Sequence, residues 1–389
     1  MFLRKPARRP ISPFITLWNW LLNLTIYVLL VVLMTNVGEF RLLSQLNSGM
    51  SIFESPWLLL LVVMTILFVC GAVHELGHLL AGLLMRFRFQ LLVMGPIKVQ
   101  RKRYGLRWGW QSGSSLFSGL TACLPMSADK LRWRMLAFAV GGPLASLLLV
   151  GVGAFIFFHY RRDFDFLHEA GWLVEVGLLT AVASAIFFIS SLKPGLYHTG
   201  LPADGGRIFS LLQGGPMAER WCTLVLLNGA DALGQRPRDW DATLVYKAMT
   251  MADGTHDDLS ARILGYQWAL DNGRMEMAWR LLDEALENWT AWMSGARINL
   301  TLEKAYFLAY HRRNAHDARL WFEQVRQKRM MCPIHHRAEA AILLAEGNYP
   351  EAQAQAASGL AALAKEVPSG TVLAESDWCE DILRRAQNP

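Results

Sequence analysis

The sequence has 389 residues, of which 53% are hydrophobic and only 18% are charged, and its formal net charge is +6. A soluble chain usually carries about 25% charged residues, so this composition argues against an entirely soluble protein. Nearly all the long apolar runs fall before residue 195, and the remainder is typical of a water-soluble helical protein. This division predicts a membrane-embedded half followed by a soluble half.

Four apolar runs are long enough to cross a bilayer, which requires about 20 apolar residues. They cover approximately residues 14–37, 57–85, 135–159 and 171–192. The first run is longer than a secretory signal and no small-residue cleavage site follows it, so we expect it to be retained. The sequence therefore predicts a mainly α-helical, polytopic membrane protein whose transmembrane domain covers residues 1–215.

The basic residues of the short loops predict the orientation of these spans. The first thirteen residues carry four basic residues and no acid, and segment 86–134 carries ten basic residues against one acid. Segments 38–56 and 160–170 each carry one more acid than base. We therefore expect both termini and segment 86–134 to be cytosolic, in a cell membrane such as a bacterial plasma membrane. Topology then explains the positive net charge, and no nucleic-acid partner is expected.

The second apolar run carries His74, Glu75 and His78, which are unusual residues for a membrane helix. A carboxylate there costs at least about 2.5–3.5 kcal/mol on insertion scales, so it needs a compensating role. The two histidines are four residues apart, which places them on one helix face. This H-E-x-x-H arrangement predicts a zinc ion held by two imidazoles, with Glu75 placed to take a proton from the attacking water in amide hydrolysis.

A catalytic zinc site needs a third protein ligand. The Pro- and Gly-rich segment 190–212 contains Asp204, and irregular backbone at membrane depth is tolerated only where it lines a protein-enclosed or wet cavity. His198 is the competing ligand, and an ordinary surface turn is the alternative reading of the segment. His74 lies about 26 Å along the helix from Trp57, which places it toward the cytosolic side, where the fourth span also ends.

Segment 89–110 contains three strand-like stretches, interrupted by Gly95-Pro96 and by Gly105. These stretches are Gln90–Val93, Ile97–Gln100 and Tyr104–Trp110. They predict a small β element at the membrane surface, whose exposed edge could pair with an unwound substrate by strand addition. The alternative is a basic loop that lies on anionic lipid headgroups.

Three motifs together resemble the site-2 protease family of intramembrane zinc metalloproteases. In chain order they are HELGH at 74–78, GGPLASLLL at 141–149 and LPADGG at 201–206. The resemblance covers residues 57–212, about 40% of the chain. It implies one catalytic zinc ion, held by His74, His78 and Asp204, with Glu75 as the general base.

The chain departs from the family pattern at two positions near these motifs. Ser146 stands where the family often has asparagine, which makes Ser146 a candidate for contacting substrate or an oxyanion. The alternative role of the segment 141–146 is close helix packing, because its residues are small. Ala203 replaces the usual leucine before the aspartate.

The remainder of the chain is predicted to be a linker, 216–240, followed by a cytosolic helical domain, 241–389. Its helices are expected in three pairs, at 260–288, 303–325 and 337–363. The second helix of each pair opens near a small residue, Ala278, Ala318 or Ala352. The spacings are 40 and 34 residues, and the second equals the tetratricopeptide period. We expect a tetratricopeptide-like array that binds a protein partner or regulator, with an unspecific helical bundle as the alternative.

The function expected from these features is hydrolysis of a peptide bond in or near a transmembrane segment of another membrane protein, as in regulated intramembrane proteolysis. The partners are then the lipid bilayer and a transmembrane substrate. The alternative is a membrane scaffold of the same fold that cleaves nothing and recruits partners through its helical domain.

Overall fold

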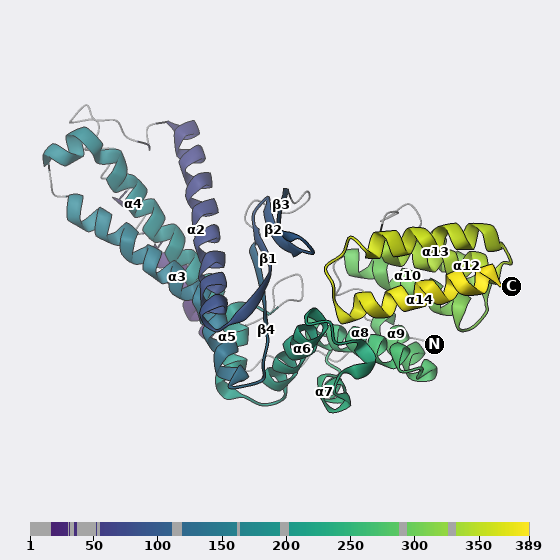
Figure 1. The fold of residues 1–389 in the computed structure, drawn as a ribbon. Coiled ribbons are helices and arrows are strands. Elements are labelled where there is room, and N and C mark those ends of the chain that lie inside the picture. The colour runs from purple at the N-terminus through teal and green to yellow at the C-terminus, as the bar shows by residue number, and fades with distance from the viewer. Residues whose placement is uncertain are drawn as a thin grey trace.

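The computed structural model shows a mainly helical protein with one small antiparallel sheet (Figure 1). Three helices in the described part of the chain are long and apolar enough to cross a membrane, namely Pro56–Leu84, Leu131–Tyr160 and Gly171–Ser191. The structure describes residues 17–29, 31, 35–36, 52, 55–110, 119–161, 164–194, 202–287, 294–325 and 332–388. The predicted span 14–37 lies partly outside these residues, and its described part includes a short apolar helix, Leu17–Leu29.

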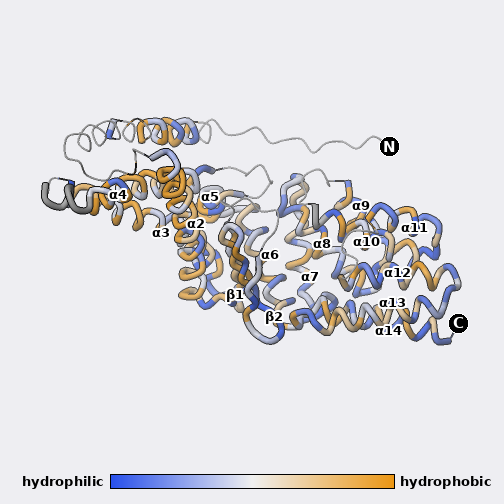
Figure 2. The backbone as a smooth tube through the Cα atoms, turned by 90° about the horizontal axis from the view of Figure 1, so that it is seen from above, coloured by the Kyte–Doolittle hydropathy of each residue, from blue (hydrophilic) through white to orange (hydrophobic). Residues whose placement is uncertain are grey.

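The membrane helices α2 (Pro56–Leu84), α3 (Leu131–Tyr160) and α4 (Phe164–Ser191) pack against one another at one end of the molecule. Apolar residues dominate these helices, whereas apolar and polar residues mix in the helices that follow (Figure 2). Large apolar side chains such as Leu61 and Leu148 point away from the protein, with 64% and 65% of their surface exposed. Such exposure is expected of helices whose outer faces contact lipid.

The sheet follows α2 directly and has the strand order β3-β2-β1-β4, with every pair antiparallel. Its strands are β1 (Phe87–Met94), β2 (Ile97–Lys102), β3 (Gly105–Trp110) and β4 (Gly119–Pro125). The first three confirm the strand-like stretches of the sequence, and β4 was not expected. Because β1 and β4 both pack against α2, the sheet reaches the helix that carries the H-E-x-x-H motif.

Segment 216–240 is not the linker that we predicted. After α5 (Asp204–Gln213) it forms α6 (Pro216–Ala232) and a short 3₁₀ helix, η2 (Pro237–Asp239). Leu224 and Leu227 of α6 are buried, and α6 packs on β4 so closely that a Cβ on Gly229 would meet the Pro125 carbonyl oxygen at 2.4 Å. The preceding Gly-Gly-Pro and the shortness of the apolar run 224–227 concealed an amphipathic helix, which joins the sheet to the helical region.

The helical region contains the expected helix pairs. They are α8 (His256–Asp271) with α9 (Met275–Glu287), α10 (Ser294–Tyr310) with α11 (Ala315–Glu323), and α12 (Pro333–Ala345) with α13 (Tyr349–Leu363), between α7 (Ala242–Ala248) and α14 (Gly370–Gln387). Consecutive pairs contact each other, and Ala278, Ala318 and Ala352 are completely buried. Small residues at these positions let the paired helices approach closely; the tetratricopeptide-like repeat itself stays a prediction.

Two sets of contacts join the helical region to the membrane half. In the first, Arg207 of α5 pairs with Asp257 of α8, with Nη2 2.7 Å from Oδ1, and its guanidinium lies 4.3 Å from the centre of the Trp221 ring. In the second, Lys102 near the β2–β3 turn forms an ion pair with Glu366 at 2.9 Å. The Arg207 pair is largely shielded from solvent, so it holds α5 against α8 more firmly than a surface ion pair would.

Candidate metal centre

The structure brings together three predicted site residues from positions far apart in the chain. Asp204 Oδ2 lies 3.0 Å from His74 Nε2 and 3.4 Å from His78 Nε2, and the two Nε2 atoms are 3.3 Å apart. These three groups form the one cluster of metal-ligating side chains found among the described residues. The three side chains therefore converge as the sequence predicts, and zinc binding stays a prediction.

Helix α2 presents its histidines on the face that packs into the membrane bundle. The residues at every fourth position on this face, Ile66, Cys70, His74 and His78, are all buried. Cys70 Sγ lies 3.1 Å from Ser184 Oγ of α4, so its thiol faces a neighbouring helix. The i, i+4 spacing thus continues the buried face formed by Ile66 and Cys70 with two metal-ligating side chains, His74 and His78.

The remaining ring nitrogens of both histidines have hydrogen-bond partners on α3. His78 Nδ1 lies 2.8 Å from the Phe138 carbonyl oxygen and 3.3 Å from the Gly142 backbone N. The nearer carbonyl oxygen can only accept, so a neutral His78 carries its proton on Nδ1 and leaves the lone pair on Nε2. His74 Nδ1 lies 3.0 Å from Ser146 Oγ, which can accept in the same way. Such partners fix the orientation of metal-ligating imidazoles. Ser146 is 1% exposed and contacts His74, and its possible contact with substrate or an oxyanion stays a prediction.

Asp204 is the first residue of α5, and the end of α4 holds that helix in place. Gly205 packs directly on the Leu192 carbonyl, because a Cβ on Gly205 would lie 2.1 Å from that oxygen. Only glycine allows this approach, which explains why the aspartate is followed by glycine. His198, the competing ligand, lies outside the described residues.

The small residues of α3 let its backbone approach α2 closely. A Cβ on Gly141 would lie 2.5 Å from the Gly77 carbonyl oxygen, and a Cβ on Gly142 would lie 2.3 Å from His78 Nε2. The packing role expected for segment 141–146 is therefore confirmed at Gly141. Gly142 has a further role, because its missing side chain leaves the space that the His78 ring occupies.

Glu75 lies beside the cluster and is held by the sheet. Its Oε2 accepts a hydrogen bond from Thr121 Oγ1 of β4 at 2.7 Å. A cavity of about 30 Å³ lies next to it, with His74 and Gly119 also in its wall. This is about the volume that one water molecule occupies in the liquid. Thr121 could not be identified from the sequence, because no local pattern in β4 marks it as a neighbour of α2.

Two imidazole nitrogens and one carboxylate form a donor set that suits zinc, and three protein ligands are typical of catalytic zinc sites. The Nε2 atoms of both histidines point at the Asp204 carboxylate, and their Nδ1 atoms have hydrogen-bond partners. Glu75 lies beside this cluster. The residues present therefore fit a catalytic zinc ion. Comparison with known protein families, with curated proteins and with solved structures finds no match, so the assignment depends on this geometry and on the sequence motifs.

Proposed function

We propose that this protein is an intramembrane zinc metalloprotease that hydrolyses a peptide bond in or near a transmembrane segment of another membrane protein. The observation that carries the proposal is the convergence of His74 and His78 with Asp204, 3.0 and 3.4 Å from its carboxylate, beside Glu75 on a helix that is long and apolar enough to span a membrane. Buried ionisable groups in a membrane helix are costly and mark functional sites by default.

Each residue has a distinct role in the proposed reaction. His74, His78 and Asp204 hold the zinc ion, which when bound supplies a Lewis acid that makes water acidic enough to attack a peptide carbonyl near neutral pH. Glu75 accepts the proton of the attacking water and later gives a proton to the leaving amine. Thr121 orients the Glu75 carboxylate by donating to Oε2.

The position of the histidines supports cleavage near the cytosolic face. They lie in the last third of α2, whose C-terminal end leads into the basic segment that is expected to be cytosolic. The proposal therefore includes a multi-pass protein of the cell membrane with both termini in the cytosol. The helical region then recruits a substrate or regulator on that side through its tetratricopeptide-like pairs.

The test compares the parent protein with Glu75→Gln in liposomes that contain a fluorescent transmembrane reporter. Glu75→Gln should retain zinc, measured by elemental analysis, and should cleave at least about 100-fold more slowly, which is the lower range for loss of a general base. Glu175→Gln is the matched control, because Glu175 is also a buried carboxylate of a membrane helix and accepts a hydrogen bond from Ile52 N at 2.7 Å, away from the cluster. It should keep both zinc and cleavage.

Asp204→Ala tests the third ligand separately and should lower zinc occupancy. Full occupancy in that variant would show that another residue, such as His198, completes the site. Zinc bound at one ion per chain without cleavage of any reporter would instead favour the scaffold that cleaves nothing.

A further inference from the structure

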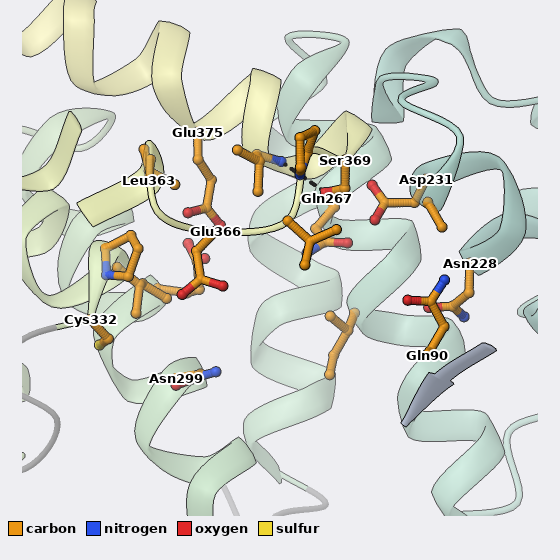
Figure 3. A pocket seen from close by; sticks show the side chains of 18 of the residues that line it. Gln90, Asn228, Asp231, Gln267, Asn299, Cys332, Leu363, Glu366, Ser369 and Glu375 are labelled. Carbon is orange, nitrogen blue, oxygen red and sulfur yellow. Dashed lines mark hydrogen bonds between the residues drawn. The ribbon is translucent and has the colours of Figure 1, made fainter. Parts of the chain in front are cut away.

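A cavity of about 600 Å³ lies between the sheet and the helical region, separate from the metal cluster. Its wall includes Arg88 and Gln90 of β1, Asn228 and Asp231 of α6, and Glu375 of α14 (Figure 3). Cavities of roughly 300–1,000 Å³ accept small ligands or a few residues of a peptide. Because β1, α6 and α14 all contribute to the wall of this cavity, a ligand bound in it would contact both the sheet and the helical region.

Four carboxylates line the cavity, and two of them already have cationic partners. Glu303 accepts from Arg337 Nη2 at 2.6 Å and from the Tyr266 hydroxyl at 2.9 Å. Glu366 forms its ion pair with Lys102. These two acids are therefore part of the protein's own charge network.

The other two carboxylates, Asp231 and Glu375, have no ion pair with any described residue. Asp231 Oδ1 accepts from the backbone N and the hydroxyl of Thr371, at 2.6 and 2.7 Å. No described group donates a hydrogen bond to Glu375, and its side chain points from α14 into the cavity, as Asp231 does from α6 (Figure 3). Burial raises the pKa of Glu375 to about 7 even though the nearby charge of Arg337 lowers it, and burial also raises the pKa of Asp231. A bound cation would relieve this cost.

The arrangement of the wall favours a polypeptide over a metal ion. No cluster of three or more metal-ligating groups was found at these carboxylates among the described residues, so the wall lacks the ligand set of a typical metal site. Amide side chains at Gln90, Asn228 and Gln267 add hydrogen-bond donors and acceptors, which suit a peptide backbone. Apolar residues such as Ile263 and Val372 suit the methylene groups of long basic side chains.

We propose that this cavity binds a lysine- or arginine-containing polypeptide segment, with its basic groups facing Asp231 and Glu375. On the proposed protease function, that segment is the cytosolic flank of the transmembrane substrate. Membrane proteins carry an excess of Lys and Arg in short cytosolic flanks. Strand β1, which supplies Arg88 and Gln90, begins just after α2 ends, so the cavity lies on the side where the metal-bearing helix leaves the membrane domain.

The binding test uses the full chain with Glu75→Gln, placed in nanodiscs of uncharged lipid, so that its readout does not depend on cleavage. The probe is a fluorescent peptide of alternating lysine and glycine, and fluorescence anisotropy reports binding. Glu375→Gln and Asp231→Asn should each weaken binding at least about tenfold, as expected when a hydrogen bond to a charged group is lost. Glu380→Gln is the matched control, because Glu380 lies exposed on the same helix, outside the cavity wall.

Equal binding of the lysine peptide by Glu375→Gln and Glu380→Gln would overturn the proposal, as would equal binding of a peptide with glutamate in place of lysine. Charge-selective binding by a chain that cleaves no reporter would support the cavity and overturn its link to a protease substrate. In a chain that does cleave, Glu375→Gln should raise KM about tenfold for a reporter with a lysine-rich flank and leave kcat unchanged. A reporter with a glutamate-rich flank should show no such change.

Discussion

Replacement of Gly142 by alanine tests whether helix packing shapes the metal centre. The added Cβ would lie 2.3 Å from His78 Nε2, whereas ordinary contact begins at 3.4 Å, so the ring has to move by about 1 Å. Metal–ligand distances tolerate only about 0.2 Å. Loss of an outer partner alone costs about 10–100-fold in metal affinity, so displacing a ligand should weaken zinc binding by more than about 100-fold.

The assay is competition for zinc against a fluorescent chelator, with the melting temperature of the metal-free protein as a check on folding. Gly151→Ala is the matched control on the same helix, because an added Cβ there meets nothing within 4 Å. Both changes bring the same gain in helix propensity, about 1 kcal/mol, so any difference between them comes from the contact with His78. Equal zinc affinity in the two variants would refute the role given to Gly142.

Three further outcomes follow from the same structure. Ser146→Ala removes the hydroxyl next to His74 Nδ1 and should weaken zinc binding about 10–100-fold, measured by chelator competition; unchanged affinity would contradict its orienting role. Zinc removal should lower the melting temperature of the parent protein but leave that of Asp204→Ala nearly unchanged, and a zinc-independent parent would argue against the site. Because the pKa of Glu375 is raised to about 7, its charged form destabilises the folded state as pH rises from about 5 to 8. Glu375→Gln should therefore have a free energy of unfolding on the order of 1–2 kcal/mol higher than the parent protein at pH 8 and equal to it at pH 5, measured by denaturant unfolding.

The membrane helices and the histidine pair could be predicted because their signals are local. A run of apolar residues specifies a membrane helix, and the i, i+4 spacing alone places His74 and His78 on one face. Asp204 was found by combining an irregular segment with an estimate of depth in the membrane. The contact that positions Asp204, between Gly205 and the Leu192 carbonyl at the end of α4, could be seen only in the structure. It depends on two backbone segments that meet in the folded protein.

Features built from distant segments could not be predicted from local patterns. Strand β4 lies next to Glu75 because it pairs with β1. No local pattern in the short segment 119–125 predicts that pairing. Helix α6 was taken for a linker because it follows Gly214-Gly215 and its apolar run, 224–227, is only four residues long. The contact between the Ser146 hydroxyl and His74 Nδ1 could not be predicted either, because it depends on how α3 packs against α2.

The ion pair between Arg207 and Asp257 has a consequence for deletion experiments. Arg207 lies one turn after Asp204 on α5, so α8 braces the short helix that carries the third candidate ligand. A fragment truncated after Gln213 would retain every candidate ligand and yet lose this brace. Inactivity of such a fragment would consequently reveal nothing about recruitment, and point substitutions in the intact polypeptide are the cleaner way to separate the two contributions.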